Sequence, residues 1–438
     1  MEFAGFYNLT VEQRRKMASE FAKLSADEQK TIASDSALPL GTASRMIENV
    51  IGTYQIPLGL ATNFVINGRD VLVPMAIEEP SVVAAASNGA KMAKESGGFV
   101  VSSTDPVMIG EISIVRMQDA QAGFDQLQKN KPKLIQIASK YAQGIEKYGG
   151  GVKGCDVEMF DSAMGKMLLL KYYIDVRDAM GANTVNTILE LSAPEVEKMA
   201  GGQSRMRILS NLATKRIARA SAKWKKEALG ADNVEKILEG YELAVCDPFR
   251  CATHNKGIMN GIDAVAVACG QDWRAIEAGC HAYAAMGGRY RPLTKYYKDK
   301  NGDLVGEIEI PVPVGIVGGA TKTHPMAQVC LKFLGVKTAQ ELGEIMAAVG
   351  LAQNFAALRA ITMEGIQKGH MRLHAKNIAI AAGATGEDID RVASLMASQG
   401  SISISAAQDI LLGKKGGDEK IENGEMPSGK KPKAKRKN

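Results

Sequence analysis

Four short segments of this sequence concentrate polar side chains in apolar surroundings, and each could take part in chemistry. The stretch from Asp247 to Gly257 carries arginine, histidine, asparagine and lysine beside glycine-rich turns, and Asp272 follows sixteen positions after Lys256. Such a group of cations and amides would form an anion-binding surface. A solvated loop has the same composition, so spacing alone leaves both interpretations open.

The other three segments are equally open when each is taken alone. In Glu78-Glu79-Pro80-Ser81, a carboxylate at a helix start is usually stabilised by the helix dipole. The segment Asp178–Asn183 follows a strand and resembles a nucleotide-contacting turn, yet it lacks the GxGxxG pattern and could be a plain strand-to-helix turn. His370 and His374 share a helical face, but no third ligand is evident, so we predict no metal site.

The positive charge of the chain lies in its last residues. The net charge is +6, and the final nine residues alone contribute six positive charges. The rest of the chain is therefore not basic, and we expect no nucleic-acid partner. From residue 413 onward the composition turns to Gly, Lys, Glu and Pro, which predicts a disordered basic tail over 413–438.

Cysteine usage and hydropathy indicate a cytoplasmic protein. The six cysteines form no CxxC pair, and scattered thiols fit a reducing compartment better than a disulfide framework. The N-terminus has no apolar signal core. No apolar run approaches the roughly 20 residues of a membrane span.

The periodicity of apolar residues predicts alternating helices and strands. Asn67-Gly68 between two apolar runs predicts a hairpin, and Thr10 with Gln13 predicts a capping box. Strand–helix–strand alternation after Asp105 indicates a small α/β or α+β domain inserted in a larger one. The further expectations are helices over 42–51, 82–94, 120–147 (with Pro132 as a possible break), 193–199, 205–225, 339–377 and 385–396, and strands over 112–117, 167–176 and 306–317.

Taken together and in order, these segments resemble a known family. Met46–Gly52, the Glu79 segment, Asp178–Asn183, His254–Gly257, Gly318–Pro325 and His370-Met371 are similar to those of 3-hydroxy-3-methylglutaryl-coenzyme A (HMG-CoA) reductases. The resemblance runs from about Phe6 to Leu412 and is closest to the soluble class II form. It implies interconversion of HMG-CoA and mevalonate plus CoA by two hydride transfers, through mevaldyl-CoA and mevaldehyde.

The resemblance also implies a fold and its division into domains. We expect an α+β protein with a large substrate-binding domain over 1–104 and 212–364. A ferredoxin-like domain over 105–211 would bind the nicotinamide dinucleotide, which explains the missing GxGxxG. A mobile C-terminal helical flap would cover 365–412 and carry His370.

By the same resemblance, the catalytic residues are Glu79, Lys256, Asp272 and His370. Lys256 would stabilise negative charge on the thioester oxygen in a dry, buried site, with Asp272 beside its ammonium. Glu79, with a raised pKa, would donate a proton to that oxygen. Protonated His370 would return a proton to the CoA thiolate.

Substrate and cofactor contacts carry over in the same way. Arg250 matches the residue that holds the HMG carboxylate, where a guanidinium can bind both oxygens. The other matching positions are Ser81, Asn255 and Gln353 for the substrate, and Asp178, Met180, Gly181, Ala182, Asn183 and Asn211 for the cofactor.

Cofactor preference and assembly are further expectations. NADH-preferring relatives often carry an aspartate where this chain has Ala142, and losing that carboxylate removes a repulsion against a 2′-phosphate. We therefore expect NADPH to be favoured over NADH, with dual use possible. The family's active site forms between subunits, which implies at least a homodimer. The alternative is an inactive CoA-ester or nucleotide-binding protein of the same fold.

Overall fold

In the computed structural model, which describes residues 3, 5–35, 37–363 and 375–413, the larger sheet begins with a tight hairpin. Strands β1 (Leu58–Ile66) and β2 (Arg69–Ala76) pair antiparallel through Asn67-Gly68. Asn67 and Gly68 have φ values of 46° and 77°. A two-residue hairpin turn requires this left-handed backbone, which asparagine and glycine adopt most readily. The predicted hairpin is confirmed.

The larger sheet has six strands in the order β2-β1-β3-β8-β10-β9. Its remaining strands are β3 (Phe99–Ser103), β8 (Ile217–Trp224), β9 (Thr294–Lys298) and β10 (Leu304–Pro311). The helix predicted over 205–225 is wrong, because this segment contains most of β7 (Gln203–Ser210), a strand of the smaller sheet, and then β8. The alanines and basic residues favour a helix locally, but β8 is paired on both sides, by β3 and β10. Tertiary pairing overrides local propensity here.

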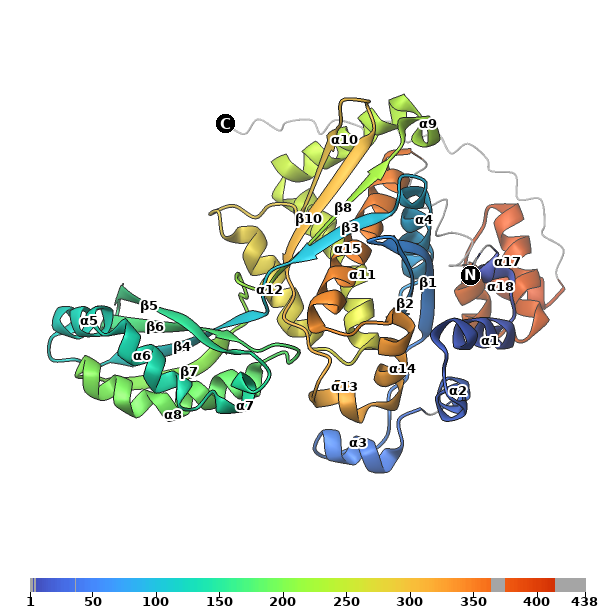
Figure 1. The fold of residues 1–438 in the computed structure, drawn as a ribbon. Coiled ribbons are helices and arrows are strands. Elements are labelled where there is room, and N and C mark those ends of the chain that lie inside the picture. The colour runs from blue at the N-terminus through green and yellow to red at the C-terminus, as the bar shows by residue number, and fades with distance from the viewer. Residues whose placement is uncertain (1–2, 4, 36, 364–374, 414–438) are drawn as a thin grey trace, which may run out of the picture. The chain divides into compact units, whose positions relative to one another are not determined.

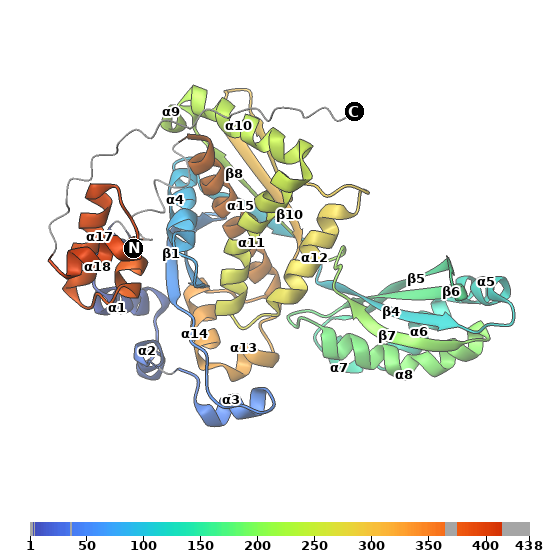
Figure 2. The same cartoon turned by 180° about the vertical axis from the view of Figure 1, so that it is seen from behind.

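Helices pack on one face of this sheet, as Figures 1 and 2 show. They include α4 (Val82–Lys94), α10 (Ala231–Cys246), α11 (Pro248–Ala268), α12 (Trp273–Ala285) and α15 (Ala339–Met363). Among the described residues, α15 alone is long and apolar enough to cross a membrane, but 72% of its most apolar window is buried inside the fold. It packs against α11, α4 and the sheet, so it is the central core helix.

The smaller sheet has four strands in the order β5-β6-β4-β7. Its strands are β4 (Val107–Val115), β5 (Gly151–Ser162), β6 (Gly165–Asp175) and β7 (Gln203–Ser210). Helices α5 (Ala120–Lys129), α6 (Lys131–Ser139) and α8 (Ala182–Ala200) cover one face (Figure 1). Pro132 divides the predicted helix, since proline is tolerated only in the first turn of α6. This β-α-β-β-α-β order with antiparallel pairing is ferredoxin-like.

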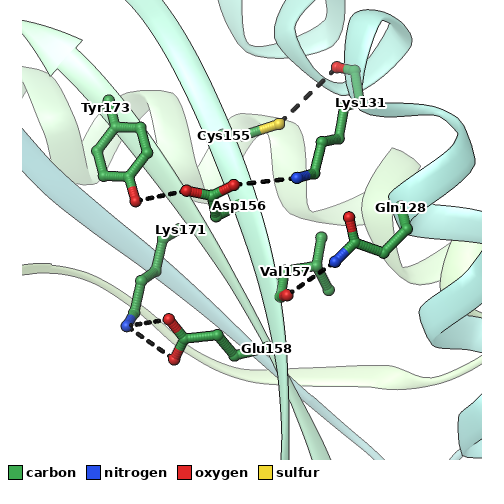
Figure 3. A network of polar contacts seen from close by, with 8 residues as sticks. All are labelled: Gln128, Lys131, Cys155, Asp156, Val157, Glu158, Lys171 and Tyr173. Carbon is green, nitrogen blue, oxygen red and sulfur yellow. Dashed lines mark hydrogen bonds and ion pairs between the residues drawn. The ribbon is translucent and has the colours of Figure 1, made fainter.

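Edge strand β5 is fastened to its neighbours by a polar network (Figure 3). Lys131 Nζ and Tyr173 Oη both bond to the Asp156 carboxylate, at 3.0 and 2.8 Å. Lys171 Nζ lies 2.8 Å from both oxygens of Glu158. Burial raises the pKa of the neighbouring Cys155 thiol to about 11, which keeps it protonated. The charged groups of this network pair with one another, and the network holds β5 to β6 and α6.

The remaining helices lie around these sheets or in a second unit. The chain divides into two compact units, Met1–Ile366 and Gln367–Asn438. The second contains α17 (Glu387–Gln399) and α18 (Ile404–Leu411) with a small core of its own. The first also contains η1 (Phe6–Asn8), α1 (Val11–Ala22), α2 (Ala26–Ala33), α3 (Leu40–Met46), α7 (Gln143–Glu146), α9 (Lys226–Leu229), α13 (Gly319–Thr323) and α14 (Pro325–Leu334).

The α+β class is confirmed, whereas the four-part domain division stays a prediction. The core under the smaller sheet runs from Met108 to Ala213, within a few residues of the expected domain over 105–211. The helix expected over 42–51 ends early, at Met46, and residues 47–57 form no helix or strand. The basic tail over 413–438 lies almost wholly outside the described residues.

Close backbone contact between α4 and α15 fixes the core beside the larger sheet. A Cβ on Gly89 would lie 2.4 Å from the carbonyl oxygen of Ala352. The Gly89 carbonyl also accepts from Trp224 Nε1 at 3.2 Å. The Trp224 ring stacks on Phe355 with centroids 3.9 Å apart. Only glycine permits this approach.

Replacing Gly89 by alanine should therefore lower the unfolding temperature. The added methyl group must push α4 away from α15, which costs about 1–3 kcal/mol for overpacking of a core. Differential scanning calorimetry measures the effect. The matched control is Gly41→Ala in α3, where a new Cβ meets nothing within 4 Å. If Gly89→Ala unfolds at the wild-type temperature, the contact between α4 and α15 is wrongly placed.

Candidate functional site

Glu79 and Lys256, two of the four predicted catalytic residues, are in direct contact. Lys256 Nζ donates to Glu79 Oε2 at 2.8 Å, although 177 positions separate the two residues. Glu79 lies in the turn between β2 and α4, and Lys256 lies in α11. This turn is strained, because Ser81 has φ of 75°, a left-handed backbone that non-glycine residues rarely adopt. The ammonium and the carboxylate could share a proton, or both could bond to one oxygen of a substrate.

Lys256 lies on the uncovered side of α11. The lysine side chain is 59% exposed and the Glu79 side chain 37%. Residues 252, 253, 256 and 260 are at least partly exposed, a helical spacing that marks one face, while Ile258 and Met259 are buried. The expectation of a buried ammonium is therefore wrong for the single chain, since no element of the described chain covers this stripe.

Asp272 follows the far end of α11, at the start of α12, and does not contact Lys256 in the same chain. Its Oδ1 accepts from the Ala275 N–H at 3.1 Å, which caps α12, and pairs with Arg274 at 3.1 Å. The preceding Gln271 N–H donates to Ala266 O, ten positions beyond Lys256 and about 15 Å along the helix axis. The expectation that Asp272 lies beside the Lys256 ammonium fails within one chain, because α11 continues for three more turns before the chain reverses.

Arg250 lies in the first turn of α11, the helix that carries Lys256. His254 of the same helix is neutral and adds no positive charge. The N-cap Asp247 accepts from the Arg250 N–H at 2.7 Å. Burial lowers the pKa of the Arg250 guanidinium, which forms no ion pair with any described residue. Burial also lowers the pKa of His254 to about 3, and its Nε2 lies 2.7 Å from Thr294 Oγ1. Of the expected anion-binding surface, Arg250 and Lys256 carry the charge and His254 is a neutral core residue.

The two amides predicted to bind substrate differ in their surroundings. Asn255 is fully buried, and its side chain bonds to Arg291 O at 2.9 Å and to the Leu293 N–H at 3.0 Å. This amide thus joins α11 to the segment before β9, and a role of Asn255 in substrate binding stays a prediction. Gln353 of α15 is 5% exposed, and its Oε1 has no partner. An orphan buried acceptor of this kind fits a group that bonds to a ligand.

The predicted cofactor residues lie where β6 leads into α8. Gly181 has φ of 107° and starts this long helix without any side-chain cap, and the first turn holds no acidic residue. Ala182 and Asn183 are the first helical residues, with Met180 just before them. Free N–H groups at a helix start and the helix dipole together favour phosphate groups. These residues therefore fit the diphosphate of a dinucleotide.

The structure also places three other residues of the cofactor expectations. Asp178 Oδ1 accepts from the Ala339 N–H at 2.8 Å, so this carboxylate is already used at the start of α15. Asn211 is exposed just after β7. Ala142 is 1% exposed within the core of the smaller sheet, so its side chain cannot face a nucleotide. The preference for NADPH over NADH stays a prediction.

His370 lies outside the described residues, and nothing here places it. Among the residues that the structure describes, no three or more His, Cys, Asp or Glu side chains gather as a metal site. The histidine and the flap that would carry it stay predictions.

Comparison with known proteins decides the family. The family model described as hydroxymethylglutaryl-coenzyme A reductase matches residues 10–375 of the chain. The chain belongs to the HMG-CoA reductase family. It is an oxidoreductase of this family, as the resemblance in the sequence implied.

Individual relatives agree over nearly the whole length. The 3-hydroxy-3-methylglutaryl-coenzyme A reductase of Archaeoglobus fulgidus is 54% identical over 408 residues, which cover 93% of each chain. A class II reductase from Streptococcus pneumoniae bound to NADPH in open conformations matches with a TM-score of 0.80 and 38% identity, covering 82% of this chain and all of that one. A second structure of the reductase from that species matches with a TM-score of 0.81 and 36% identity, covering 95% of this chain and all of that one.

The reductase fold also contains a half-buried acidic cluster that sequence reasoning missed. Asp263 of α11 lies against Glu277 of α12, and burial followed by this neighbouring carboxylate raises the pKa of Asp263. His281 Nε2 lies 2.8 Å from Glu277 Oε2 and lowers the pKa of Glu277. His281 Nδ1 lies 2.7 Å from Tyr290 Oη. The one available signal was the Glu277–His281 spacing of four residues, typical of paired side chains on a helix.

Replacing Asp263 by asparagine should stabilise the reductase, and more so as pH rises. In the folded state Asp263 holds its proton above the ordinary aspartate pKa of about 3.9, so the wild type loses stability as pH rises from there through the raised folded pKa. Asparagine imitates the protonated acid and does not titrate. Thermal melting at pH 5 and pH 8 should show a larger gain at pH 8.

The control for this experiment is Asp27→Asn, an aspartate whose side chain is 91% exposed. It should shift the melting temperature by a similar small amount at both pH values. An Asp263→Asn difference that does not grow with pH would mean that Asp263 is ionised in the folded reductase.

Proposed function

We propose that this chain reduces HMG-CoA to mevalonate and CoA at the Lys256–Glu79 pair, with NADPH as the preferred hydride donor. The observation that carries the proposal is the 2.8 Å contact between these two side chains, brought together from α11 and the β2–α4 turn. Bound at the start of α8, the dinucleotide would supply the hydride. NADPH is favoured because a structural neighbour is a class II reductase bound to NADPH.

In this proposal, the ammonium of Lys256 holds the thioester oxygen as hydride addition gives that oxygen negative charge. A fixed cation aimed at a developing oxyanion is among the strongest devices that a protein can offer. Glu79, within hydrogen-bond distance of the same ammonium, would deliver a proton to the oxygen. Arg250 would hold the terminal carboxylate of the substrate through paired hydrogen bonds. His370 would protonate the departing CoA thiolate.

Such an ammonium acts strongly only where water is excluded. In the single chain Lys256 is 59% exposed, and Asp272 of that chain caps α12, beyond the far end of α11. A second copy of the chain would solve both problems, because it could cover the exposed stripe of α11 and bring its own Asp272 to Lys256. We therefore propose a homodimer whose active sites lie between the subunits, in a cytoplasmic enzyme.

The segment after α3 supports this assembly. Ile47, Ile51, Tyr54, Ile56 and Leu58 are all exposed, with Ile51 and Tyr54 more than 90% accessible. Soluble monomers rarely present so many large apolar side chains in one short segment, and such segments usually meet a partner. This stretch overlaps Met46–Gly52, one of the segments that carry the family resemblance.

Replacing Lys256 by alanine should abolish most of the HMG-CoA-dependent oxidation of NADPH. Removing the oxyanion-stabilising cation should cost at least about 10²–10³ in kcat. Absorbance at 340 nm measures the rate, with NADH compared in parallel, and NADPH should give the higher kcat/KM. The matched control is Lys236→Ala, which removes a partly exposed lysine paired with Asp232 at 2.6 Å on α10.

Two results would contradict this part of the proposal. Near-normal turnover by a folded Lys256→Ala protein would mean that the lysine has another role. Wild-type protein that binds HMG-CoA calorimetrically without oxidising either cofactor would favour the alternative, an inactive binding protein of the same fold.

Replacing both Ile51 and Tyr54 by aspartate should convert the dimer to monomers and remove activity. The charges would be buried without partners at the interface. Sedimentation velocity measures the oligomeric state, and Met164→Asp, at an equally exposed position in the β5–β6 turn, is the control. A double variant that still sediments like the wild type would exclude this segment as the interface.

A further inference from the structure

The turn that leads into α8 is held by groups from outside its own sheet. The Ile316 N–H donates to Asp178 O at 2.9 Å, and the Ala339 N–H donates to Asp178 Oδ1 at 2.8 Å. Ile316 follows β10 of the larger sheet, and Ala339 is the first residue of α15. One aspartate thus fastens the proposed cofactor turn to two elements of the substrate-binding side.

The buried side chain of Arg216 also bonds the turn before α8 to the segment that follows β10. It is 5% exposed, and its guanidinium donates to Ala179 O at 3.0 Å, Met180 O at 3.2 Å and Val314 O at 2.5 Å. Burial lowers the pKa of Arg216 to about 10, so the group is still charged at neutral pH. A buried charge is costly unless it is fully hydrogen-bonded, and the planar guanidinium can bond several carbonyls at once.

Gly315 places the two backbones in contact at the same point. A Cβ there would lie 2.5 Å from Met180 N and 2.9 Å from Ala179 C. The Gln271 side chain bonds to both Gly315 N and Gly315 O, at 2.9 and 2.8 Å. Gln271 directly precedes Asp272. A continuous set of contacts therefore runs from the cofactor turn through Gly315 to a proposed catalytic residue.

We propose that Arg216 is a positioning residue for hydride transfer, which holds the Asp178–Gly181 turn against Val314–Ile316. It thereby fixes the start of α8, where the dinucleotide would bind, relative to Gln271 and Asp272. The inference rests on the proposed function. It assigns the role to a residue that touches neither ligand and acts only through backbone carbonyls.

The sensitivity of hydride transfer to geometry makes this role measurable. Reacting atoms must approach to about 3–3.5 Å, and a displacement of about 1 Å can cost 10²-fold in rate. A residue with a merely structural role would lower the melting temperature and leave the kinetic constants of the surviving folded protein unchanged. A positioning residue changes kcat and the binding of one substrate selectively.

The experiment compares Arg216→Met with Gly315→Ala and with the control Arg219→Met. Gly315→Ala keeps the guanidinium but inserts a methyl group between the two backbones. Arg219 lies three residues along β8 and pairs with Glu309 at 2.6 Å on the surface. For both test variants we expect kcat to fall about tenfold or more, with a raised KM and Kd for NADPH and an unchanged KM for HMG-CoA. Hydrogen exchange at the Ile316 and Ala339 amides should quicken.

Wild-type kinetic constants and unchanged exchange in folded Gly315→Ala would overturn the inference. If Arg216→Met does not fold, Gly315→Ala decides alone. An equal rise in KM for both substrates would also count against it, because that pattern indicates general loosening. The proposed function fails separately, if the wild type does not oxidise NADPH with HMG-CoA. In that case the calorimetric affinity for NADPH and the hydrogen exchange of the Ile316 and Ala339 amides still test whether Arg216 holds the turn.

Discussion

The contact between Lys256 and Glu79 depends on how closely α11 approaches the β2–α4 turn. Both elements are held by α15, a largely apolar helix that packs on α11, α4 and the strands of the larger sheet. Gly89 allows α4 to touch α15, and Trp224 fills the space beside them. The ion pair itself is partly exposed and adds little stability. The hydrophobic core creates the geometry, and the charged pair at its edge is available for chemistry.

In the proposed function, that geometry leaves one chain with only part of the oxyanion site. Lys256, Glu79 and Arg250 are grouped near the first half of α11, whereas Asp272 caps the helix that follows its far end. A rigid helix cannot bring both ends to one ligand, because each residue adds about 1.5 Å. Exposed apolar residues after α3 and an exposed stripe on α11 are the features that association of two chains would cover. In this view the dimer completes the active site and does not merely stabilise it.

In the proposed function, the smaller sheet would hold the hydride donor and the larger sheet the acceptor, so the junction between the two sheets must fix their relative position. The ferredoxin-like sheet provides an uncapped helix start, suited to phosphate groups, and does so without the glycine pattern of a Rossmann domain. Arg216, Asp178 and Gly315 connect that helix start to the larger sheet through backbone groups. A buried arginine at this junction is expensive to maintain. In the proposed function, this cost is offset because Arg216 holds the cofactor turn against the segment that follows β10.

The sequence alone determined what depends on local chemistry: the Asn67-Gly68 hairpin, the Thr10 capping box, the break at Pro132 and, through ordered motifs, the family. Local signals failed where distant partners decide the outcome. Residues 217–224 have the composition of a helix but pair as a strand between β3 and β10, and Asn255 and Ala142 look available for ligands but are buried. Only the tertiary structure could show that Asp178 binds a helix start, that Lys256 is exposed in one chain, and that Arg216 joins the two sheets. Burial and long-range hydrogen bonds are properties of the packed chain, and no residue type or spacing encodes them by itself.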